Sequence, residues 1–149
     1  MKNRMKYGGL MLLLYMLTAC NHTKQKQDTK EIFCKEDTTE VVMLATEYLE
    51  HLKNKEFNEA IQMLYHIEGD SVLKLTTNEQ EDLMKQYEYF PVLSYKIESI
   101  FLSGIHSTEI MYNIKFFEKQ EGDERPNTLK FRLNPQRINN AWYLGVLNR

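Results

Sequence analysis

The side chains best suited to chemistry in this sequence are two cysteines and four histidines. The histidines are His22, His51, His66 and His106, and no two are spaced as metal ligands on one element. Only His51 has a carboxylate at helical spacing, Glu47, which is typical of an exposed ion pair. One histidine and one carboxylate do not make a metal site, and two cysteines cannot supply the four ligands of a zinc ribbon. We therefore expect no metal and no cofactor.

Cys20 lies at the end of an amino-terminal apolar segment. Three basic residues precede this segment, whose apolar run covers residues 8–19. Twelve helical residues span about 18 Å, which is too short for the roughly 30 Å hydrocarbon core of a membrane. The length suits a signal peptide instead. The sequence Leu17-Thr18-Ala19-Cys20 resembles the lipobox of bacterial lipoproteins.

This resemblance implies that residues 1–19 are a signal peptide and that Cys20 receives lipid, which anchors the mature protein to a membrane. Several acyl chains hold more firmly than the marginal anchor that one chain provides. Residues 20–36 are too polar to bury a face and are expected to form a flexible tether, roughly 20–25 Å from end to end. The expected location is the cell envelope, at the outer membrane facing the periplasm if the organism is Gram-negative.

The charge of the chain argues against nucleic acid as a partner. The sequence has 19 basic and 21 acidic residues, and all three charged residues of segment 1–19 are basic. The remainder therefore carries 16 basic and 21 acidic residues. Nucleic-acid binding requires concentrated positive charge, which a mildly acidic domain lacks.

Residues 37–149 are expected to form one domain whose first half is helical. Asp37 with Glu40 suits a helix start, and the apolar residues that follow recur at spacings of three and four up to Leu52. A shorter helix is predicted from Phe57 to Leu64. A third follows Thr77 and Gln80, which have the spacing of a capping box. Residues 72–75 have no clear type.

The second half of the domain alternates with a period of two, which predicts four strands. The residues expected to face inward are Tyr95, Ile97, Ser99, Phe101, Ile110, Tyr112, Ile114, Phe116, Leu129, Phe131, Leu133, Trp142, Leu144 and Val146. By parity Lys96, Glu98, Ile100, Lys115, Lys130 and Arg132 face outward. Helices followed by successive strands predict an α+β fold with a curved, four-stranded antiparallel meander packed on the long helix.

This order of elements resembles the cystatin-like folds and, more narrowly, the NTF2-like superfamily with its small lipoprotein members. The residues that carry the resemblance are the helical segment 45–64, with Phe57-Asn58-Glu59-Ala60, and the final run Asn140-Ala141-Trp142-Tyr143-Leu144, where Ala stands in place of the usual Gly. Isomerases and dehydratases of this superfamily place Asp, His or Tyr inside a cone-shaped pocket. The predicted core faces here offer almost no carboxylate or imidazole to act as a general base. We therefore expect a protein that is not an enzyme.

The domain is rich in aromatic residues, and these allow two interpretations. They fill the core between helix and sheet, or Tyr95, Tyr112 and Trp142 line a pocket with their hydroxyl and N–H groups toward a ligand. The favoured function is a non-catalytic binding or scaffolding domain for an envelope protein or a small apolar ligand. The alternative is a small NTF2-like enzyme that acts on a hydrophobic substrate.

Cys34 has no intrachain partner once Cys20 is acylated. It packs as a small hydrophobe at the start of the domain, or it pairs with another molecule; a redox role would require a second cysteine nearby.

Overall fold

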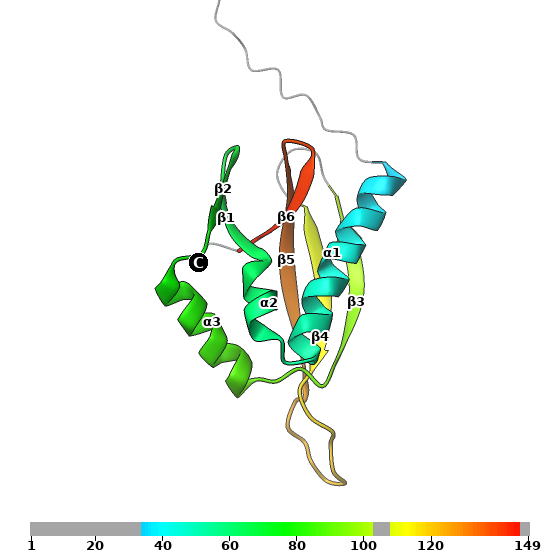
Figure 1. The fold of residues 1–149 in the computed structure, drawn as a ribbon. Helices are drawn as coiled ribbons and strands as arrows, with labels where there is room; N and C mark the ends of the chain where they lie inside the picture. Colours follow the sequence, from blue (N-terminus) through cyan, green and yellow to red (C-terminus); the bar gives the residue numbers. More distant parts are fainter. Residues whose placement is uncertain (1–33, 103–107, 147–149) are drawn as a thin grey trace, which may run out of the picture.

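The computed structural model describes residues 34–102 and 108–146, which form three helices and six strands (Figure 1). The predicted signal peptide, Cys20, most of the tether, His22 and His106 lie outside the described residues. The helices are α1 Lys35–Lys53, α2 Phe57–Gln62 and α3 Thr77–Tyr89. The strands are β1 Leu64–Glu68, β2 Ser71–Lys74, β3 Ser94–Phe101, β4 Glu109–Lys115, β5 Thr128–Ile138 and β6 Ala141–Gly145.

The six strands form one mixed sheet in the order β2-β1-β6-β5-β4-β3. The α+β class is confirmed, but the expected four-stranded antiparallel meander is only part of the sheet. Strands β3 to β6 form that meander, and the hairpin of β1 and β2 extends it, with β1 parallel to β6. The sequence pattern does not predict this hairpin, because its strands are only five and four residues long. Leu64, expected at the end of a helix, begins β1, and Gly69 (φ +58°) forms the tight turn that follows.

The long helix α1 packs on the sheet through the apolar stripe expected from its spacing. Val41, Ala45 and Leu49 have no solvent exposure, and Tyr48 and Leu52 are buried beside them. These residues recur at three and four positions, so one face of the helix meets the sheet. Figure 1 shows α1 crossing the sheet near β3 and β6, with α2 beside it and α3 on the far side of α2.

Two helices begin slightly earlier than their sequence signals indicate. Helix α1 starts after Cys34, and Asp37 accepts a hydrogen bond from the Cys34 backbone N–H at 2.9 Å instead of heading the helix itself. Helix α3 starts after Thr76, whose backbone N–H donates to Glu79 at 2.8 Å. Thr76 and Glu79 have the same spacing as the expected pair one residue later. The competing residue, Gln80, donates its side-chain amide to the Leu75 carbonyl.

The expected inward face of β3 is wrong beyond its middle. The pairing of β3 with β4 shifts between Ile97 and Ser99, which marks a bulge. The extra residue reverses the alternation, so Ile100 packs against the core while Phe101 is 59% exposed. On β4 the expected alternation is confirmed, since Ile110, Tyr112 and Ile114 are all buried. Trp142 lies on β6, in the interior of the sheet, as expected.

Candidate functional site

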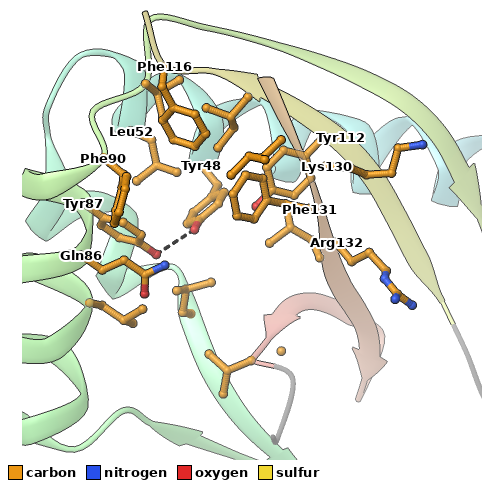
Figure 2. A pocket seen from close by; sticks show the side chains of 18 residues that line it. Tyr48, Leu52, Gln86, Tyr87, Phe90, Tyr112, Phe116, Lys130, Phe131 and Arg132 are labelled. Atoms are coloured by element: carbon orange, nitrogen blue, oxygen red, sulfur yellow. Dashed lines mark hydrogen bonds between the residues drawn. The ribbon is translucent and has the colours of Figure 1, made fainter. Parts of the chain in front are cut away.

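A groove of about 870 Å³ lies between α3 and the face of the sheet on which the helices pack (Figure 2). Its lining comes chiefly from α1, α3, β4, β5 and β6. Apart from tyrosines, the polar side chains among the described lining residues are Gln86, Lys130 and Arg132. A concave site with mostly apolar walls and few polar groups is the usual form of a small-molecule site.

Three tyrosine hydroxyls bring polarity into this apolar groove. The hydroxyl oxygens of Tyr48 on α1 and Tyr87 on α3 lie 2.8 Å apart, and this hydrogen bond joins the two helices. Tyr112 on β4 lines the same groove. Burial raises the pKa of all three phenols. The hydroxyls therefore stay protonated at neutral pH and serve as hydrogen-bond donors.

A series of aromatic rings forms one wall of the groove. The rings of Tyr112 and Phe131 stack with centroids 5.8 Å apart, and Phe131 meets Phe116 edge to face at 6.1 Å. Phe116 meets Phe90 in the same way at 6.1 Å. Phe90 is 59% exposed, and so the series runs from the buried tyrosines to solvent.

The two cations of the lining belong to the outer face of β5. Figure 2 shows the Lys130 and Arg132 side chains pointing away from the Tyr48–Tyr87 pair. The Lys130 ammonium lies 2.8 Å from the Glu98 carboxylate, and the Arg132 guanidinium lies 3.6 Å from that of Glu109. This outward orientation is the one predicted from strand parity, and neither of these two lining cations therefore brings a free positive charge into the groove.

Of the three aromatic residues that the sequence predicts to line a pocket, the structure places one in the groove and two outside it. Tyr112 lines the groove. Tyr95 and Trp142 do not line it: the Tyr95 hydroxyl donates to Glu50 on α1 at 2.6 Å, and the Trp142 indole N–H donates to Asp37 at 3.4 Å. Both of these side chains bind α1 to the sheet.

Sequence reasoning did not identify Tyr48 and Tyr87 as partners. The spacing of apolar residues places Tyr48 in the apolar stripe of α1 and Tyr87 in the third helix, and it indicates no contact between them. A signal was present, because a tyrosine within an apolar helix face needs a partner for its hydroxyl. The pairing itself depends on how the two helices pack.

The histidines in the described residues pair with carboxylates near the surface. His51 pairs with Glu56 at 2.7 Å and not with Glu47 as expected, because the chain turns back after α1 and brings Glu56 beside the ring. His66 on β1 pairs with Glu79 on α3 at 2.8 Å. In the described ranges no three His, Cys, Asp or Glu side chains gather as metal ligands.

Cys34 is exposed and does not pack in the core. Its thiol lies 3.1 Å from an Asp37 carboxylate oxygen, and the residue occupies the N-cap of α1.

Comparison with known proteins gave no match: no protein-family model matches the chain, and no curated protein or solved structure is significantly similar to it. Of the helices within 34–102 and 108–146, none is long and apolar enough to cross a membrane.

Proposed function

We propose that this protein is a cell-envelope lipoprotein, anchored through lipid on Cys20, whose domain binds a small apolar ligand in the groove beside α3. The observation that carries the binding proposal is the groove itself. It combines about 870 Å³ of space with aromatic walls and a small cluster of neutral hydroxyls. Such a composition favours an apolar molecule that is oriented by few polar contacts.

The domain is further proposed to be NTF2-like. The hairpin of β1 and β2, which stands between α2 and α3 and precedes strands β3 to β6, supports this proposal, because many members of that superfamily carry a short hairpin before their main strands. The long first helix on a curved sheet and the Trp-bearing last strand are in keeping with it.

Binding fits the groove better than catalysis does. None of the lining residues within the described ranges is Asp, Glu or His. Those side chains are the usual general bases near neutral pH, and burial keeps the lining tyrosines protonated. The groove therefore has walls and hydrogen-bond donors but no side chain prepared to remove a proton from a substrate.

The binding proposal can be tested with a neutral dye, N-phenylnaphthylamine, whose fluorescence rises in apolar surroundings. We expect saturable enhancement by the purified full chain. Leu83→Glu places a charge in the α3 wall and should weaken dye binding more than tenfold. Since α3 has no fully buried residue, this change should leave the fold intact, as circular dichroism can verify.

The matched control is Leu73→Glu, at an exposed position of β2 that does not line the groove. It should bind the dye like the wild type. Absence of saturable binding by the wild type would refute the proposed function. Equal affinity of a folded Leu83→Glu variant would show that the ligand binds elsewhere.

A further inference from the structure

Two of the three hydroxyl protons in the groove have no acceptor among the described residues. Tyr48, Tyr87 and Tyr112 each carry one O–H, and the contact between Tyr48 and Tyr87 uses one of the three protons. Within the described residues no protein acceptor takes either of the other two. The Tyr112 hydroxyl is not a sealed atom without a partner, and Tyr87 is only partly buried, so solvent or a ligand can reach this side of the cluster. The groove therefore presents two O–H donors.

The electrostatics of the groove disfavour an anion as the acceptor. Lys130 and Arg132 point outward and are engaged by carboxylates on neighbouring strands. An ionised carboxylate that entered the groove would lose its hydration without gaining a cation. Such desolvation costs far more than the transfer of a neutral carbonyl oxygen that accepts hydrogen bonds.

The apolar wall indicates where the rest of a ligand lies. The rings lead from Tyr112 through Phe131 and Phe116 to the exposed Phe90, and the lining residue Leu129 is itself 48% exposed. Apolar surface thus continues from the hydroxyls to the rim. A flexible chain that follows this surface would remove both rim side chains from water, which is favourable in proportion to the area covered.

We infer that the groove binds a neutral acyl ester, with the ester carbonyl oxygen accepting hydrogen bonds from the tyrosine hydroxyls and the acyl chain along the aromatic wall toward Phe90. This inference rests on the proposed function and specifies its ligand. The carbonyl oxygen has two lone pairs, which matches the two available donors.

The test compares two probes of equal chain length, methyl octanoate and octanoate, as competitors of the neutral dye on the purified full chain. Octanoate is ionised at pH 7.5, whereas the ester has no charge. We expect the ester to displace the dye at a concentration at least tenfold lower. The triple variant Tyr48→Phe, Tyr87→Phe, Tyr112→Phe keeps the rings and removes the hydroxyls. It should weaken binding of the ester three- to tenfold more than binding of the dye, the range that a net hydrogen bond supplies.

Tyr95→Phe is the control, because it removes a hydroxyl that binds Glu50 outside the groove. It should leave both affinities unchanged. If octanoate competes as well as the ester, or if the folded triple variant keeps full affinity for the ester, the inference is wrong although the groove still binds the dye. If the wild type does not bind the dye at all, the proposed function and this inference fail together.

Discussion

The indole N–H of Trp142 donates to the carboxylate of Asp37 at 3.4 Å, across 105 positions of sequence. Asp37 lies in the first turn of α1, and Trp142 lies on β6 in the interior of the sheet. The same carboxylate lies 3.1 Å from the Arg137 guanidinium of β5. One buried acidic side chain thus fixes the start of the long helix to two strands.

We expect Trp142 to report on folding and not on ligand binding. The residue is 7% exposed, so its emission should be shifted to the blue. Trp142→Ala should cost roughly 3–5 kcal/mol in the free energy of unfolding, measured in urea. Trp142→Phe should keep the fold and the affinity for the dye. Quenching of Trp142 by a ligand bound in the groove would contradict this prediction.

Replacing Asp37 should destabilise the domain, because its buried carboxylate is held by several partners. Asp37→Asn removes the charge that Arg137 and the Cys34 N–H engage. A hydrogen bond to a charged group is worth roughly 1.5–3 kcal/mol, and we expect a loss of unfolding free energy in that range. The control is Asp82→Asn on α3, where an exposed pair with Lys85 should contribute less than about 1 kcal/mol. Equal effects of the two substitutions would show that Asp37 does not fix the helix.

How much of the structure the sequence predicts depends on whether the interacting residues are near or far apart in the chain. The stripe of α1 and the alternation of β4 depend on local periodicity, and both are confirmed. The exposure of Phe101 depends on a bulge that is defined only by pairing with β4. Tyr48 and Tyr87 are 39 positions apart, and their contact depends on the packing of α3 against α1. Periodicity can assign a tyrosine to a face but cannot select its partner.

The apolar face of α1 should tolerate no charge. Leu49 has no solvent exposure, and Leu49→Asp buries a carboxylate without a partner, at a cost of several kcal/mol. Far-ultraviolet circular dichroism should show loss of both helix and sheet. Met43→Asp, at a position of the same helix that is 67% exposed, should change the unfolding free energy by about 0.5 kcal/mol or less. A folded Leu49→Asp variant would contradict the packing of α1.

The N-terminal cap of α3 should lose strength in acid. The Thr76 hydroxyl and backbone N–H, together with His66, lower the pKa of Glu79 from 4.5 to about 2. Because the folded pKa lies below the unfolded value, the contribution of Glu79 to stability is complete above about pH 4.5. It is lost as the pH falls toward 2.

The measurement is the difference in urea midpoint between the wild type and Glu79→Gln, followed from pH 6 to pH 2.5. We expect the difference to shrink across this interval, because the protonated wild-type side chain comes to resemble the amide. Glu81→Gln, on the same helix, controls for a general effect of removing a carboxylate. A difference that does not change with pH would contradict the assigned role of Glu79.

Lipidation at Cys20 is the prediction on which the membrane anchor depends. Cells that express the protein and take up an alkyne-bearing fatty acid should label the wild type but not Cys20→Ala. The variant should also accumulate as a precursor that keeps residues 1–19, because the expected processing depends on Cys20. Cys34→Ala is the matched control: it removes the other cysteine, which caps α1 at the start of the domain, and should leave labelling intact. Labelled Cys20→Ala protein would assign the lipid to another residue, and absence of label on the wild type would leave the groove without its membrane anchor.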